Sequence, residues 1–559
     1  MTILRALRCE MDHEVEMAGG LREGLCMAWT RRRFLGTCAG IGATALLRRA
    51  EAVTETRPAC GRVYHLSVSM DALDADPGLL AIVQKAGVTD LWLTGFLYGH
   101  WHYSLERMRQ WRERVIKLGM NAHVCNVPLG HPGDSLGAMD GTVPLTPPKH
   151  WRMGCRADGS LYAGTSLHPP ATEENVQALQ QLHEIGVRQV FLDDDFRLAT
   201  SPGMIGGCFC DDHREQFLKS RGYDTQRWND LLDAVHNRKL TGVMREWVDF
   251  TCDQLTASFR AQQAAMPSGR LGNMVMYFGA EKAGIRLADY KDVPLRVGEL
   301  MFNDDSFAPI KNKTAELFSA LFHRRFVSPE LAFSETTAFP ADRLSARNMA
   351  AKLAVSTLCD VRHTMFMSGL TAVPIGHWDT LGPAMRKHAR IHPQIAGHSM
   401  RGPFKHYWGE HSRFVGDDNP NSLFLAVGVP FEVTAEPARD GWTFLSEHDA
   451  GGAAAGHLRS RGTTFVTRSE SPTRPEGAWT CQESLQAMFD LKRKLLPQLA
   501  NVPFVEEEKP VVCAWYPGAR AVLLWNLAEQ RERFTIRFKE VQRPVTVEGL
   551  DIELVEDIG

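Results

Sequence analysis

The chain alternates short apolar runs with longer amphipathic segments over most of its length. Eight apolar runs have the length and composition of buried strands: residues 63–70, 90–96, 121–127, 189–195, 272–278, 295–303, 331–338 and 364–368. Between them, residues 173–184 carry apolar side chains at helical spacing, and residues 344–358 form a second helical pattern after a turn that contains Pro340. Eight strands separated by helices predict an α/β fold, a (β/α)8 barrel over residues 53–395.

Two further domains are predicted after the barrel. Residues 396–505 again alternate short strands with helices, which indicates a second α/β domain. Residues 506–559 contain apolar runs at 521–526, 533–538 and 545–554, which predict a small antiparallel β domain. Several domains are expected in any case, because a chain of 559 residues is too long for one hydrophobic core.

The N-terminal residues 1–52 indicate a targeting segment. The run Thr-Arg-Arg-Arg-Phe-Leu-Gly at 30–36 precedes an apolar stretch that ends at Leu47, and residues 50–52 have the small-x-small form of a cleavage site. This pattern resembles a twin-arginine export signal and predicts a mature chain that begins near Val53, in the periplasm or outside the cell. The apolar stretch is too short to span a bilayer, so no membrane association is expected after cleavage. A basic amphipathic surface helix is the alternative.

Composition narrows the classes of partner. The formal net charge is −3, with 23% of residues charged and 44% hydrophobic. This balance gives no reason to expect a nucleic acid or a membrane surface as partner.

The ends of the predicted strands carry carboxylates, imidazoles and aromatic rings, at the face where such a barrel has its active site. Aromatic faces stack on the C–H surfaces of sugars, while carboxylates and imidazoles bind sugar hydroxyls. The predicted substrate is therefore an oligosaccharide, a polysaccharide or another glycoside. The predicted substrate-binding residues are Asp71, Tyr98, His100, Trp101, Asn126, Asp193, Asp195, Arg197, Tyr277, Glu299, Asn303 and Trp378.

Two groups of carboxylates stand out at these strand ends. Asp193, Asp194 and Asp195 end the fourth predicted strand, and Glu335 lies on the seventh. Hydrolysis of a glycoside needs one carboxyl group that donates a proton and one ionised carboxylate across the scissile bond. Crowded carboxylates repel one another, which favours a protonated member in the triplet. We assign the acid/base role to Asp194 and the nucleophile role to Glu335.

Both assignments have alternatives. Asp193 and Asp195 are expected to bind hydroxyls or to raise the pKa of Asp194. Glu299 on the sixth strand is the substitute nucleophile. Glu335 could instead be a structural carboxylate paired with Arg343 or Arg347.

Cys208, Cys210 and His213 form a Cys-x-Cys-x-x-His motif. Two thiolates and an imidazole within one turn suit a structural zinc if a fourth ligand comes from elsewhere. Cys155 and Cys125 are the candidates, and we assign Cys155. The alternative is a disulfide or a pair of buried thiols. No organic cofactor is expected.

The barrel with these carboxylates resembles the large clan of retaining barrel hydrolases, in which the acid/base follows strand four and a Glu nucleophile ends strand seven. The resemblance implies a double displacement with retention of configuration. It covers residues from about Val63 to Trp378. The chain departs from that clan in one respect, because Asp replaces the usual Asn-Glu after strand four.

Residues 207–217, Gly-Cys-Phe-Cys-Asp-Asp-His-Arg-Glu-Gln-Phe, are similar to the Cys-x-Cys-x-x-Cys segment of family 42 β-galactosidases, where cysteines hold a structural zinc. Here His213 replaces the last cysteine. The 396–505 domain looks like the amidotransferase-like domain that mediates trimer formation in those enzymes, and the last domain also has a counterpart there. The resemblance therefore implies a divergent relative of family 42 and a homotrimer.

Two hypotheses about a different function stay open. A degenerate barrel can bind glycans without cleaving them, and the missing Asn-Glu is compatible with this. The acidic cluster could instead hold a catalytic metal, with Asp193, Asp195 and His213 or Asp304 as ligands for a hydrolytic or lyase reaction.

Overall fold

The computed structural model describes residues 61–130, 147–193, 196–199, 201, 203–298, 300–456 and 462–558. The predicted export signal lies outside this part, and so do Asp194, Asp195 and Glu299. Within the described part, no helix is both long enough and apolar enough to cross a membrane.

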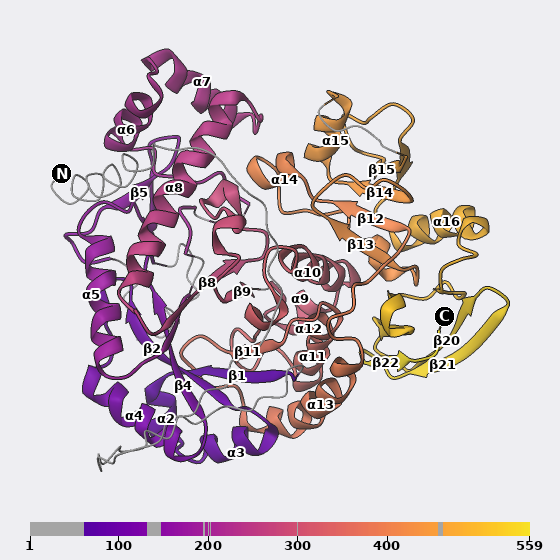
Figure 1. Ribbon diagram of the computed structural model, residues 1–559, viewed down its shortest axis with the longest axis horizontal. Helices are drawn as coiled ribbons and strands as arrows, with labels where there is room; N and C mark the ends of the chain where they lie inside the picture. Colours follow the sequence, from indigo (N-terminus) through magenta and orange to yellow (C-terminus); the bar gives the residue numbers. More distant parts are fainter. Residues whose placement is uncertain are drawn as a thin grey trace, which may run out of the picture. The chain divides into compact units, whose positions relative to one another are not determined.

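Eight parallel strands close into a barrel, as the sequence predicts (Figure 1). The closure is made by β1, which pairs with β2 on one side and β11 on the other. A ninth strand, β3, extends β2 as a short antiparallel hairpin. The barrel strands are β1 Val63–Val68, β2 Asp90–Leu97, β4 Asn121–Val127, β7 Gln189–Leu192, β8 Arg270–Met276, β9 Leu295–Gly298, β10 Ala332–Thr337 and β11 His363–Met367, and β3 is His100–Trp101.

Helices connect the barrel strands, and the predicted 173–184 helix is part of α5. The predicted 344–358 helix is divided into α11 and α12, which meet at Lys352. The helices of this region are α2 Met70–Ala75, α3 Leu79–Ala86, α4 Leu105–Lys117, α5 Ala171–Glu184, α6 Asp211–Arg221, α7 Thr225–His236, α8 Gly242–Ala264, α9 Asp304–Phe307, α10 Ile310–His323, α11 Ala346–Ala351, α12 Leu353–Leu358 and α13 Trp378–Ile391.

Two excursions leave the simple strand–helix alternation. The hairpin of β5 (Met153–Cys155) and β6 (Leu161–Thr165) lies between β4 and α5. Helices α6 and α7 precede α8 in the segment between β7 and β8. Both excursions follow the carboxyl ends of barrel strands, the face on which barrel enzymes have their active sites.

The domain after the barrel has a five-stranded, fully parallel sheet in the order β13-β12-β14-β15-β16. It is an α/β domain, and its closer likeness to an amidotransferase domain stays a prediction. Its elements are β12 Phe404–Tyr407, α14 Glu410–Phe414, β13 Phe431–Thr434, β14 Trp442–Leu445, α15 Glu447–Ala454, β15 Thr464–Arg468, β16 Trp479–Cys481 and α16 Leu485–Leu495.

The last part of the chain forms two three-stranded antiparallel sheets, β17-β20-β21 and β18-β19-β22. One hydrophobic core runs from Tyr64 through the α/β domain to Ile552. The three regions therefore share a core rather than standing as separate units. The strands are β17 Phe504–Val505, β18 Val511–Tyr516, β19 Ala521–Asn526, β20 Glu532–Phe538, β21 Val541–Val547 and β22 Ile552–Val555.

The middle of the barrel is filled by side chains of five strands. One buried cluster consists of three aromatic and two sulfur-containing side chains: Trp92, Cys125, Phe191, Phe333 and Met365. Such a layer closes the barrel as a packed core. Polar groups at the carboxyl ends of the strands consequently rest on an apolar floor.

Candidate active site and metal centre

An arginine joins the two predicted carboxylate positions. Arg296 on β9 is fully buried, its Nη2 donates to Oδ1 of Asp193, and its Nε lies 3.1 Å from Oε2 of Glu335. Asp193 follows β7 and is 7% exposed, and Glu335 on β10 is 4% exposed. The ends of strands four and seven thus meet on one planar guanidinium, through a charge-assisted hydrogen bond to Asp193 and an ion pair with Glu335 in a low-dielectric site.

Alternation along β9 aims Arg296 inward, because its neighbours Leu295 and Val297 face away from the barrel axis. The guanidinium lies over the ring of Phe191, with 5.5 Å from its carbon to the ring centroid. Its Nη1 is 2.8 Å from the Met365 sulfur. A cation this deep needs a carboxylate partner, and it has two.

Glu335 has a second polar contact within its own strand. The hydroxyl of Thr337 donates to its Oε1. Of the two alternative partners expected from the sequence, Arg347 donates from its guanidinium to the carbonyl of Glu529. The cation beside Glu335 is therefore Arg296, which the sequence analysis did not single out.

Four predicted substrate-binding residues lie at the strand ends or at the surface. Asp71 is exposed and pairs with Arg107 on α4 at 2.7 Å. His100 and Trp101 form β3 and are half-buried, and the Trp101 ring packs on Phe96. Arg197 is buried, with its Nε donating to the carbonyl of Ala199.

Five others have packing or capping contacts instead. Tyr98, Tyr277 and Trp378 are buried in the core. The Asn126 amide oxygen accepts from the amide of Phe96, and Asn303 caps α9 through Ser306. These contacts leave the predicted substrate-binding role of the five residues a prediction.

A polar layer of histidines lies toward the amino ends of the strands. Trp92 donates to Nδ1 of His65, and Nε2 of His65 is 3.0 Å from Nδ1 of His363. Because an indole N–H can only donate, His65 accepts at Nδ1 and carries its proton on Nε2 when neutral. Asp90 accepts from Nε2 of His123 at 2.9 Å, and burial of this carboxylate is outweighed by His65 and His123, which hold its pKa far below the usual value.

The Cys-x-Cys-x-x-His motif forms a four-residue cluster with a residue from another element. The side-chain donor atoms of His168, Cys208, Cys210 and His213 lie within 4.8 Å of one another. His168 stands in the loop before α5, so the fourth member is His168 where the sequence predicted Cys155. The Cys155 thiol instead donates to the carbonyl of Arg156, and its own carbonyl accepts from the amide of Phe209. All eight cysteines of the described residues are free thiols.

The donor set fits a metal ion. Two sulfurs and two imidazole nitrogens are the ligands of tetrahedral structural zinc sites. Burial raises the pKa of the Cys208 thiol to about 12 and lowers that of His213 to about 4, so the imidazole is neutral, as a ligand must be. A bound metal would displace the thiol protons and give the buried sulfur and nitrogen atoms of the cluster a common partner.

No protein family model matches the chain, and no curated protein matches it. Solved structures do match. The cold-adapted β-galactosidase from Rahnella sp. R3 has a TM-score of 0.58 at 11% identity, over 89% of this chain and 98% of that chain. The β-galactosidase from Bacillus circulans sp. alkalophilus has a TM-score of 0.55 at 10% identity, over 88% and 98%. At this identity the likeness shows a shared fold.

Proposed function

We propose that the protein is an exported glycoside hydrolase, a divergent relative of the family 42 β-galactosidases. The observation that carries the proposal is the pair Asp193 and Glu335, which come from strands four and seven and meet on Arg296 at the active-site face. The whole-chain likeness to two β-galactosidase structures supports it. Export rests on the twin-arginine pattern of residues 30–36.

In this proposal Glu335 attacks the anomeric carbon and the leaving-group oxygen takes a proton from the aspartate triplet. Water then cleaves the glycosyl–enzyme bond, with the same aspartate now acting as base. Arg296 forms an ion pair with Glu335 through Nε, which would hold the carboxylate in place for the attack. Because Oδ1 of Asp193 accepts from Arg296, the proton donor is Asp194, with Asp195 as a hydroxyl ligand.

The first test is hydrolysis of aryl α- and β-glycosides by the mature chain from Val53. Glu335→Gln and Asp194→Asn should each abolish most turnover on the glycoside that is cleaved, with a loss of about 10²–10⁴-fold for the acid/base. Glu330→Gln is the matched control, because Glu330 pairs with Arg362 at the surface. Retention of normal turnover by Glu335→Gln would exclude it as nucleophile.

A non-catalytic glycan-binding barrel is the second candidate. The observation in its favour is that Glu335 and Asp193 are both engaged by one buried cation, as in a structural salt bridge. Glycan binding by the wild type without hydrolysis of any tested glycoside would favour this function. A catalytic metal on the aspartates is disfavoured, since Asp193 already binds Arg296.

The metal cluster is proposed to be a structural zinc site held by His168, Cys208, Cys210 and His213. Three of these residues lie in the segment between β7 and β8, so a bound metal would fix that segment rather than take part in the reaction. A homotrimer is proposed from the resemblance of the α/β domain to its family 42 counterpart. Light scattering of the purified chain tests the trimer directly.

A further inference from the structure

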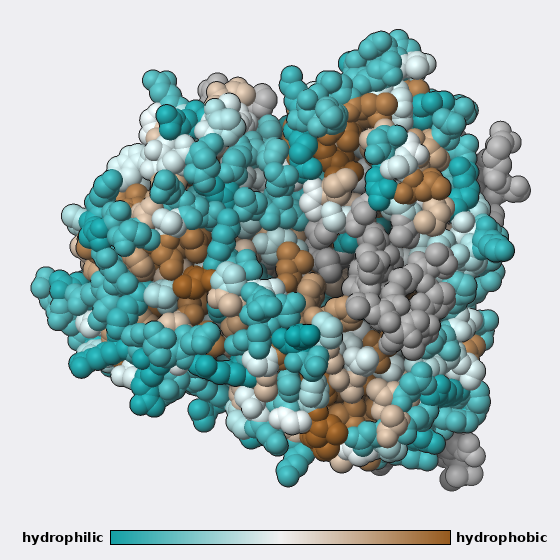
Figure 2. All heavy atoms as spheres, turned by 180° about the vertical axis from the view of Figure 1, so that it is seen from behind, coloured by the Kyte–Doolittle hydropathy of each residue, from teal (hydrophilic) through white to brown (hydrophobic). Residues whose placement is uncertain are grey.

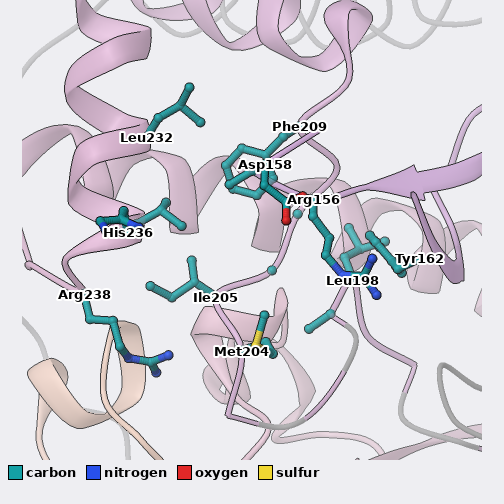
Figure 3. Close-up of a pocket in the computed structure, with 15 residues that line it drawn as sticks. Arg156, Asp158, Tyr162, Leu198, Met204, Ile205, Phe209, Leu232, His236 and Arg238 are labelled. Atoms are coloured by element: carbon teal, nitrogen blue, oxygen red, sulfur yellow. The ribbon is translucent and has the colours of Figure 1, made fainter. Parts of the chain in front are cut away.

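The hollow beside helix α7 does not select a charged ligand. It has a volume of about 450 Å³ and lies between the β5–β6 hairpin, the segment after β7 and α7 (Figure 3). Its arginines are engaged, since Arg238 pairs with Asp417 at 3.4 Å and Arg156 donates to the hydroxyl of Ser160 at 3.1 Å. On the face shown in Figure 2, hydrophobic surface is confined to small patches in a mostly hydrophilic exterior. Neither surface indicates a particular partner.

A small cavity lies between strands β9 and β10 and the helices α10 and α12 that pack on them. Its volume is about 20 Å³. A space of about 10–15 Å³ is enough for one water molecule, so the cavity has room for a water but not for a metabolite. Three buried polar side chains line it: Glu316 and His323 on α10, and Lys352 between α11 and α12.

The Glu316 carboxylate lacks a hydrogen-bond donor within the described part of the chain. The residue is 5% exposed, and no described group donates to its Oε1 or Oε2. Nζ of Lys352 faces it at 4.0 Å from Oε1, which is beyond hydrogen-bond reach. A buried carboxylate without a donor costs much of its desolvation energy. A gap of this size between two polar groups leaves room for a bridging water.

The hydrogen-bonding pattern of the cavity selects water over an ion. Nδ1 of His323 is 2.8 Å from the Ser319 carbonyl, so it carries the proton and leaves Nε2 as an acceptor, to which no described group donates. Burial lowers the pKa of this imidazole to about 4, which keeps it neutral. Glu316 and His323 thus offer acceptors and Lys352 offers donors, so the occupant must both donate and accept. A metal cation would be repelled by the Lys352 ammonium.

Lys352 connects the cavity to the active-site face of the barrel. It stands where α11 ends and α12 begins, and its Nζ donates to the carbonyl of Met301 at 2.7 Å. Met301 is buried in the loop that follows β9, the strand of Arg296. Glu335 also lines the cavity. The loop after β9 is therefore tied to the helix layer through this lysine.

We propose that the cavity binds one water molecule, which donates to Glu316 and accepts from Lys352, and that this link holds Lys352 on the carbonyl of Met301. Glu316 and Lys352 are then positioning residues for the loop after β9. Any effect on turnover rests on the proposed hydrolase function, whereas the water and the position of the loop do not. Both are measured without a glycoside, so a failure of either proposal leaves the other standing.

A high-resolution crystal structure of the mature chain tests the water. We expect a density peak about 2.6–3.2 Å from a Glu316 carboxylate oxygen and from Nζ of Lys352. Glu316→Gln should keep the peak, because its amide oxygen still accepts, and Glu316→Met should lose it. A cavity without density in the wild type would overturn the proposal, and so would an anomalous signal from a metal ion at this position.

Hydrogen exchange of the mature chain, followed by mass spectrometry, tests the positioning role. Lys352→Met should speed exchange in residues 300–303 by about tenfold, and Glu316→Met should speed it less, because the bond from Lys352 to Met301 remains. Lys85→Met, at an exposed site on α3, is the matched control. Unchanged exchange at 300–303 in both variants would overturn the positioning role. Exchange that rises equally over the whole chain would also overturn it and assign Lys352 to overall stability.

Discussion

Arg296 is a charge held among aromatic rings and thioethers, and its two carboxylate partners come from different strands. Breaking such a group by removing one member is costly, because the remaining charges stay buried without a partner. In the proposed function this triad would hold the Glu335 carboxylate in a fixed orientation.

Arg296→Met tests this at the level of one side chain. It leaves Asp193 and Glu335 buried without their cation, and we expect the free energy of unfolding to fall by about 3–5 kcal/mol. Urea unfolding of the mature chain measures the loss. Arg296→Lys keeps the charge without the planar fork, and its free energy of unfolding should lie between those of the wild type and Arg296→Met. Equal stability of Arg296→Met and wild type would show that the triad contributes no net stability.

The sequence could predict Asp193 and Glu335 from their strands but not the cation between them. Arg296 lies in a short apolar run, Leu-Arg-Val-Gly, in which the sequence alone would equally well predict an arginine at the surface. Only the register of β9 against β10 and β8 turns it inward. Likewise Tyr98 and Trp378 follow predicted strands, but their side chains pack in the core.

At the scale of elements, the cluster of His168, Cys208, Cys210 and His213 joins the loop before α5 to the start of α6. The sequence motif could not predict His168, because this residue lies 40 positions before Cys208 and no local pattern marks it. The amide of Phe209, between the two cysteines of the motif, donates to the carbonyl of Cys155 and ties the motif to the β5–β6 hairpin. Cys155, the fourth ligand predicted from the sequence, thus contacts the motif through its backbone, while His168 brings the fourth donor atom.

Metal analysis of the purified chain tests the ligand assignment. We expect about one zinc per chain, which is lost in His168→Ala and Cys210→Ser, and retained in Cys155→Ser. Loss of metal should lower the melting temperature, since binding free energy is folding free energy for such sites. Zinc lost with Cys155→Ser and kept with His168→Ala would restore the assignment made from the sequence.

Because of Asp90 on β2, we expect the stability of the barrel to fall at acid pH. Its pKa is depressed in the folded state by His65 and His123, so it stabilises the fold above the unfolded value, about pH 4, and this contribution is lost as pH falls further. Asp90→Asn should cost about 3–5 kcal/mol at pH 6. The difference from wild type should shrink below pH 4, measured by urea unfolding. Asp440→Asn, at an exposed site, is the control.

Over the whole molecule, the sequence predicted the barrel strands to within a few residues because buried parallel strands are continuous apolar runs bounded by turns. It could not show that the three regions share one core. The ring of Phe318 on α10 packs on His406 and Trp408 of the α/β domain, at 4.5 and 5.7 Å between centroids. Lys282 of the barrel pairs with Asp418 at 2.5 Å. Such contacts join residues more than 80 positions apart, where no local pattern signals them.

We expect the barrel to depend on the domains that follow it, because helix α10 packs against them. Eleven consecutive residues, 313–323, are buried, so the helix is covered on all sides and not only against the barrel. A chain ending at residue 395 would expose Phe318 and its neighbours. We expect it to bind a hydrophobic dye and to lack a sharp thermal transition, whereas Phe318→Ala in the full mature chain should keep one transition and lose about 3–5 kcal/mol. A truncated chain that melts as sharply as the full one, without dye binding, would show that the barrel is an independent folding unit.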